Sequence, residues 1–328
     1  MAKVDLIQPI LNAIQEEKWF VSIEFIRNNN SFELKIYNEN EQLWVQIYIW
    51  QLFPLVKSLK PVDEYRIQIT GVDQFESEPD GKTLILGWWD EGSVFAGFDF
   101  NKHSWALGFS PSIQIREEAL RKAHTNGFAP WEKDNQEIAI AFRPDFFVEY
   151  IRNLKDLHSF GESDTDLQVL ADISESKDEI NDKTLESVTQ KRRTAVVNVK
   201  RKQRDNSFKS RVLTSYGQKC AICGIQLKLI DAAHIVPVEH HGSDETNNEI
   251  GLCALHHRAF DRSLLTINEK YQILTNSSRM DKFKEIGLDG GMEKFFNDLR
   301  AIIHLPPAVS DRPHLENIRA ANEIRGWN

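Results

Sequence analysis

The chain has 328 residues, a formal net charge of −9 and 41% hydrophobic residues. This length is enough for two domains of ordinary size, each with its own core. No run of 18 apolar residues occurs, which excludes an ordinary membrane-spanning helix, and the N-terminus lacks the unbroken apolar stretch of a secretory signal. We therefore expect a soluble, cytoplasmic protein with no membrane partner.

Residues 1–157 predict an aromatic-rich α+β domain. Seven of the eight tryptophans lie here, and apolar residues alternate with polar ones in "FELKIYNENEQLWVQIYIW" and "EYRIQITGV". Such alternation is typical of strands with one buried face. "GWWDEGSVFAGFDF" predicts two more strands around a Glu-Gly turn. The expected fold class is α+β, built on a curved antiparallel sheet.

Three helices are expected in this domain. They cover residues 4–17, the segment "REEALRKAHTNG" that ends at Gly127, and the segment "PDFFVEYIRNLKDL" with Asp145 as N-cap.

The tryptophans of this domain allow two interpretations. Trp88, Trp89, Trp105 and Trp131 either fill a core or form a platform that stacks a nucleobase. The domain is accordingly a recognition domain for DNA or a sensor of a small molecule or partner protein.

Residues 158–204 predict a charged linker between two domains. The chain is acidic and polar from Asp156 to Gln190, which is typical of a linker or a solvated helix pair. From Lys191 to Arg211 it carries nine Lys or Arg against the single Asp205. The basic segment is either a solvated helix face or a set of contacts to DNA phosphates. The candidate DNA-binding residues are Lys200, Arg201, Lys202, Arg204, Lys209 and Arg211.

All three cysteines lie within 34 residues and have the spacing of metal ligands. Cys220 and Cys223 form one pair in "KCAICG", and Cys253 and His256 repeat the two-residue gap in "CALH". Paired ligands of this kind predict a structural Zn²⁺ site in a C-terminal domain at residues 205–328. A set of buried small apolar residues would leave the spacing unexplained.

Beside the predicted zinc ligands, a second set of polar residues remains. His257 has Asp261 four residues later on the same helix face. Upstream, His234 lies within a predicted β-branched strand, and Asn247 and Asn248 precede the second ligand pair, Cys253 and His256. A histidine base, an amide and a histidine that binds a cation are the parts of a one-metal nuclease.

The segments "CAICG", "AAHIVP" and "NNEIGLCALHHRAFDRSLLTI" together resemble the HNH endonucleases, whose ββα-metal motif binds and cuts DNA. The resemblance covers about residues 208–276, and the tail "LRAIIHLPPAVSDRPHLENIRAANEIRGWN" is more loosely similar to predicted restriction endonucleases. It implies a ββα-metal HNH domain with a zinc knuckle that hydrolyses phosphodiester bonds in double-stranded DNA, modified or unmodified, in restriction or antiviral defence.

The resemblance also implies a role for each matched residue. His234 is the general base, Asn248 orients it, and His257 holds a catalytic Mg²⁺ or Mn²⁺ with Asp261 as a further ligand. Many relatives carry a metal ligand just before the base, where this chain has Ala233. Either Asp261 supplies the missing oxygen, or the site is weakened.

Two points stay open at this stage. A weakened site would make the protein a zinc-containing DNA-binding module without catalysis. A double-strand break from one active site per chain needs two chains or two sequential nicks, so a homodimer is one of two expectations.

Overall fold

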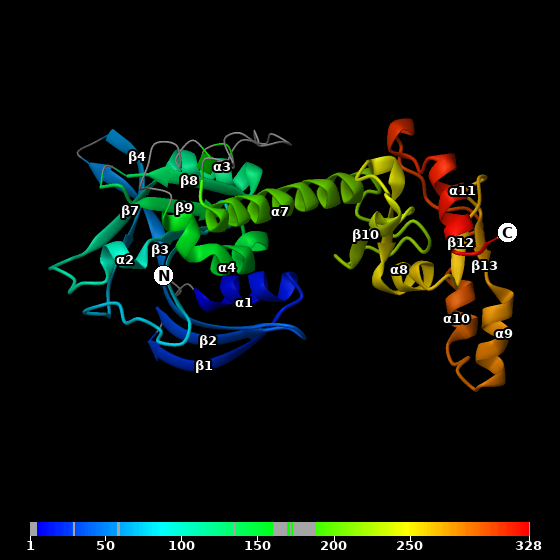
Figure 1. Ribbon diagram of the computed structural model, residues 1–328, viewed down its shortest axis with the longest axis horizontal. Helices are drawn as coiled ribbons and strands as arrows, with labels where there is room; N and C mark the ends of the chain where they lie inside the picture. The colour runs from blue at the N-terminus through cyan, green and yellow to red at the C-terminus, as the bar shows by residue number, and fades with distance from the viewer. Residues whose placement is uncertain are drawn as a thin grey trace. The chain divides into compact units, whose positions relative to one another are not determined.

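The computed structural model describes residues 5–28, 30–57, 60–133, 135–159, 169–170, 172 and 188–327. The chain divides into two compact units, Met1–Arg204 and Asp205–Asn328, and each is described here by itself (Figure 1). Much of the predicted linker, residues 160–168, 171 and 173–187, lies outside the described residues. No helix of the described chain is long and apolar enough to cross a membrane.

A mixed sheet forms the first unit, with strand order β1-β2-β3-β5-β6-β9-β8; β4 pairs with β3 and β7, off this path. The strands are β1 (Phe20–Asn28), β2 (Ser31–Tyr37), β3 (Gln42–Lys57), β4 (Lys60–Gln68), β5 (Lys82–Trp89), β6 (Val94–Phe98), β7 (Ser112–Arg116), β8 (Phe128–Glu132) and β9 (Ile138–Phe142). The predicted α+β class is confirmed.

The sheet departs from the antiparallel prediction at one pair among the strands described. β3 and β5 run parallel, with Val45 opposite Lys82 and Gln51 opposite Trp88. β4 returns antiparallel along the second half of β3, so the chain is back near the start of β3 when β5 begins. Alternation of apolar residues reveals a buried face but not the direction of the neighbouring strand.

Helices cover both faces of this sheet. Ile47 and Ile49 of β3 face a core shared with α1 (Ile7–Glu16) and α4 (Phe147–His158). Tyr48 and Trp50 face a second core shared with α3 (Glu117–Asn126). Successive strand residues point to opposite faces, so one strand supplies both cores.

The helix ends test two predictions. α3 ends at Gly127, which has φ 91° and donates its N–H to Ala123 O, as predicted. Asp145 is not the N-cap of α4, because a 3-10 turn, η1 (Pro144–Phe146), precedes that helix and Phe146 is the capping position. The Asp145 carboxylate instead pairs with Arg143 at 3.0 Å. A short helix, α2 (Phe100–His103), completes the unit.

The predicted basic segment is part of one long helix, α7 (Gln190–Ser215). Ala195, Val196 and Val199 are buried in the core that contains α1 and α4. This side of α7 therefore packs in the first unit, and Phe208 and Val212 near its C-terminal end are buried in the core of the second unit.

The second unit has the order strand, strand, helix. β10 (Ile230–His234) pairs antiparallel with β11 (Glu249–Cys253), and α8 (Ala254–Asp261) follows directly. The remaining elements are η3 (Val238–His240), η4 (Thr246–Asn248), β12 (Leu265–Ile267), β13 (Ile273–Thr275), α9 (Ser277–Glu285), α10 (Met292–Asn297), η5 (Val309–Asp311) and α11 (Leu315–Ile324).

Candidate functional site

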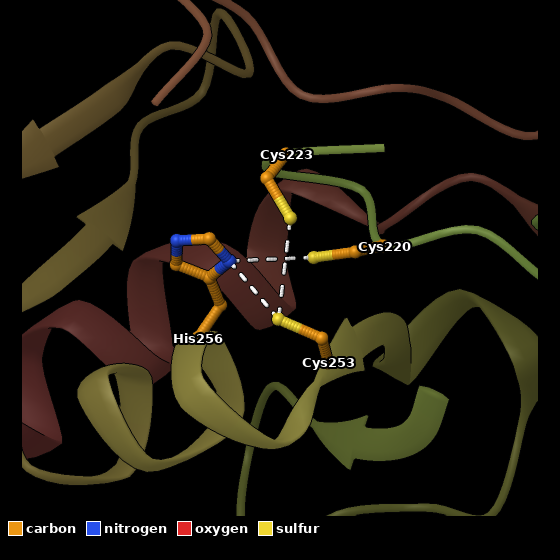
Figure 2. A group of neighbouring side chains, drawn as sticks. All are labelled: Cys220, Cys223, Cys253 and His256. Carbon is orange, nitrogen blue, oxygen red and sulfur yellow. Dashed lines mark hydrogen bonds between the residues drawn. The ribbon is translucent and has the colours of Figure 1, made fainter. Parts of the chain in front are cut away.

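Three cysteines and one histidine converge at the junction of β11 and α8 (Figure 2). His256 Nδ1 lies 3.2 Å from Cys253 Sγ and 3.5 Å from Cys220 Sγ. Cys223 Sγ lies 4.0 Å from Cys253 Sγ, and the four ligand atoms are all within 4.8 Å of one another. The first pair is held by a tight turn at Gly224, whose N–H donates to Cys220 O.

The cluster fits a tetrahedral zinc ion. Zinc bonds of 2.0 to 2.3 Å place neighbouring tetrahedral ligands about 3.3–3.8 Å apart, close to the distances seen. Burial raises the pKa of Cys223 to about 12 and also raises that of Cys253, and the nearby Cys220 adds to both shifts. Burial also opposes ionisation of Cys220, but hydrogen bonds, with His256 foremost, lower its pKa to about 6. Three thiolates here need a bound cation.

His234 stands at the end of β10 with its Nε2 atom beside two carboxylates. Nε2 forms a 3.3 Å hydrogen bond with Asp244 Oδ1 and lies 3.0 Å from Glu249 Oε1. The imidazole also packs against Phe208, with ring centroids 5.5 Å apart. Within the described chain, Nδ1 has no hydrogen-bond or ion-pair partner. Nδ1 is therefore the nitrogen that is left to accept a proton.

Glu249 is an unusual neighbour for a base. It is the β11 residue opposite His234, is fully buried, and neither of its oxygens accepts a hydrogen bond of good geometry from the described residues. Burial, and next the charge of Asp244, raise the pKa of Glu249 to about 9. The raised pKa favours the neutral form of Glu249, and the hydrogen bond of His234 Nε2 is the one with Asp244.

Asn248 acts on the backbone after His234. Its Oδ1 accepts from Val236 N at 3.0 Å, and its Nδ2 donates to Val236 O at 3.1 Å and Ser243 O at 2.9 Å. The side chain forms no hydrogen bond with the His234 ring. Arg325 adds a second backbone contact, donating to His234 O at 3.5 Å. The amide thus fixes the chain that carries the base.

His257 lies in the first turn of α8 between two carboxylates. Its Nδ1 is 3.6 Å from Asp231 Oδ2, and its Nε2 is 3.5 Å from Asp261 Oδ2. Asp231, Asp244 and Glu249 are not among the residues predicted from the sequence. Asp231 precedes His234 by three residues, and only the β10 and α8 geometry shows that it reaches His257.

The six predicted DNA-binding residues all lie on α7 and differ in their contacts. Lys202 forms a 2.9 Å ion pair with Glu17 inside the first unit. Arg211 donates to Ser207 Oγ at 3.3 Å, while Lys209 Nζ lies 3.9 Å from Asp231 Oδ1. Lys209 is therefore the residue of this set that reaches the surroundings of His257. Lys200 and Arg204 also have interaction partners, whereas Arg201 is exposed.

The tryptophans divide between the two interpretations. Trp88 and Trp89 are buried, as a core role requires, whereas Trp105 is 65% exposed. Trp105 and the fully exposed Phe109 lie in one loop. A hydrogen bond from Leu107 N to Asp73 O holds the backbone of this loop.

Two family models match the chain. Residues 44–151 match the model described as Methylase-associated X1, and residues 220–268 match the model described as HNH endonuclease. No curated protein matches. Among solved structures, a modification dependent TagI restriction endonuclease is 12% identical with a TM-score of 0.29, over 80% of this chain and 75% of that chain.

The HNH match contains the whole Cys/His cluster together with His234, Asn248 and His257. The resemblance seen in the sequence is thereby confirmed. The second unit of this chain carries an HNH endonuclease domain, and the protein is a nuclease.

Proposed function

We propose that this nuclease is a restriction-type endonuclease that hydrolyses phosphodiester bonds of double-stranded DNA with Mg²⁺ or Mn²⁺, and that Zn²⁺ holds its Cys/His cluster. The observation that supports it most is that the HNH match contains a histidine with a free Nδ1 and a second histidine flanked by carboxylates. The match of residues 44–151 to the model described as Methylase-associated X1 also supports a restriction role.

In this mechanism, His234 Nδ1 accepts a proton from the attacking water. Asp244 accepts a hydrogen bond from Nε2–H, which fixes the tautomer and stabilises the imidazolium that forms. Asn248 holds the backbone on which the base sits. His257, with a carboxylate beside it, would hold the divalent cation, which when bound supplies positive charge for the phosphate oxygens.

The first unit has two candidate roles, reading DNA or sensing another ligand, and a different observation favours each. Exposed Trp105 and Phe109 favour stacking on a base of the DNA, as in base-flipping readers. The charge of residues 1–157, with 16 Lys and Arg against 24 Asp and Glu, favours a sensor of another ligand, since this balance repels the phosphate backbone.

DNA cleavage is expected to require an added divalent cation. Purified full-length protein, mixed with supercoiled plasmid and with unmodified, methylated and hydroxymethylated phage DNA, should cut in Mg²⁺ or Mn²⁺ and not in metal-free buffer. Cleavage of only a modified DNA would favour the DNA-reading role of the first unit. Failure to cut any of these DNAs with either cation would contradict the proposed activity.

Replacing the exposed basic residues of α7 should weaken cleavage of all substrates alike. Arg201, Lys209 and Arg211 are changed to Ser together, while Lys202 is kept because its ion pair with Glu17 stabilises the first unit. Each lost phosphate contact should reduce the slope of log affinity against log salt by about 0.9. Binding measured from low to moderate salt checks this, with Lys282→Ser on α9 as the control. An unchanged slope would mean that α7 makes no phosphate contacts.

A further inference from the structure

Two carboxylates flank the His257 imidazole, and either could share a metal ion with it. Asp231 lies on its Nδ1 side at 3.6 Å, and Asp261 lies on its Nε2 side at 3.5 Å. The two ring nitrogens point in diverging directions, so an ion bound at one nitrogen is shared with the carboxylate on that side only. Asp231 and Asp261 therefore cannot both share one ion with His257 in this arrangement.

Asp231 is the better held of the two carboxylates. It lies inside β10, paired opposite Leu252 of β11, whereas Asp261 is the last residue of α8. The Asp231 side chain is 28% exposed and the Asp261 side chain 54% exposed. A carboxylate on a paired strand loses less conformational freedom when it binds an ion, and it is less hydrated beforehand.

The contact of Asp261 has a simpler explanation. Residues four apart on a helix are surface neighbours, and a His–Asp pair forms there without any ion. Asp261 also acts electrostatically on Arg325, whose guanidinium lies 4.3 Å from the ring centroid of Phe260.

Asp231 could also replace the metal ligand that many relatives carry at the position of Ala233. Residues two apart in a strand face the same side, so Asp231 and Ala233 lie along one face of β10. Ligands 2.0–2.2 Å from an octahedral ion are about 3 Å apart when adjacent, so a small side-chain rotation closes the 3.6 Å between His257 and Asp231. One imidazole and one carboxylate suit Mg²⁺ or Mn²⁺.

We infer that Asp231, with His257 Nδ1, holds the catalytic divalent cation, and that Asp261 is not a ligand of that ion. This inference rests on the proposed function and names the oxygen ligand of its cation site. Lys209 Nζ, 3.9 Å from the other oxygen of Asp231, lies beside the same carboxylate.

The test compares Asp231→Asn with its matched control Asp261→Asn in the full-length protein. Mn²⁺ binding without DNA is measured by electron paramagnetic resonance, and cleavage is measured against Mn²⁺ concentration. Asp231→Asn should weaken Mn²⁺ binding by at least about 10-fold, the lower end of the effect of losing even an outer partner of a metal ligand. The concentration for half-maximal cleavage should rise in parallel, while Asp261→Asn stays within about 3-fold of the parent.

Zinc content and melting temperature establish that the variants are folded. Asp231→Glu, which keeps a carboxylate, should retain more Mn²⁺ affinity than Asp231→Asn, so the inference stays testable if the Asn variant is unstable. The reverse ranking of the two Asn variants would overturn the inference, as would equal, unchanged Mn²⁺ binding in both. His257→Ala distinguishes a failure of this inference from a failure of the proposed function. If this variant retains both Mn²⁺ binding and cleavage, the cation site of the proposed function is itself wrong.

Discussion

His256→Ala is expected to release the zinc ion and unfold the second unit, whereas His257→Ala is expected to leave both intact. His256 is buried, and its Nδ1 points at the Sγ atoms of Cys220 and Cys253. Without His256, the three cysteines supply only three of the four ligands of a tetrahedral zinc ion. Because structural zinc contributes on the order of 10 kcal/mol in small zinc domains, the expected destabilisation is large.

His257 makes a different set of contacts, although it is the next residue. Among the described residues, its ion-pair partners are the carboxylates Asp231 and Asp261, and the ring is partly exposed. His257→Ala should therefore keep one zinc per chain and a melting temperature near that of the parent, yet lose cleavage. Elemental analysis, thermal melting and a plasmid-nicking assay on the two variants check this. Loss of zinc in His257→Ala, with His256→Ala folded and active, would show that the roles are reversed.

The different roles of His256 and His257 could be predicted from the sequence because they follow from the spacing of residues along the chain. A two-residue gap brings both members of each ligand pair to one side of a turn, and adjacent helix residues diverge by about 100°. Spacing alone thus gathered Cys220, Cys223, Cys253 and His256 into one cluster, as the structure shows. The partners of His257 and His234 depend on strand register, which spacing does not reveal.

Glu249 and Asp231 illustrate that limit. Glu249 meets His234 because β10 and β11 pair with these two residues opposite each other, fifteen positions apart in sequence. Asp231 meets His257 because α8 begins where β11 ends and returns its first turn over β10. Neither contact leaves a periodic signal, and a family motif marks only the positions that its members share.

A helix was one of the two interpretations of the basic segment, but the burial of one side of α7 was not predicted. The segment that forms α7 is rich in basic residues and follows an acidic, polar stretch, and such a composition is typical of a solvated linker. The stripe Ala195, Val196 and Val199 is short, and only packing against the first core shows that it is buried. Tertiary contacts, which local sequence does not reveal, decide which side of the helix is buried.

His234→Ala is the second variant with a large expected effect, and it tests the nuclease chemistry itself. Without the imidazole, the attacking water loses its proposed proton acceptor, and a positioned general base contributes about 10²- to 10⁴-fold to rate. The zinc cluster and the backbone contacts of Asn248 do not involve the His234 ring. The variant should therefore keep its zinc and bind DNA as the parent does.

The matched control is His240→Ala, which removes an exposed histidine from the loop after His234. It should cut at the parental rate. Asp244→Asn supplies an intermediate case, because it keeps the shape of the side chain that hydrogen-bonds to Nε2 but removes its charge. A neutral amide stabilises the imidazolium less, so cleavage should fall, but by less than in His234→Ala. Single-turnover cleavage rates across pH 5.5–9, with DNA binding measured separately, check both variants. Parental rates in His234→Ala would mean that His234 is not the base.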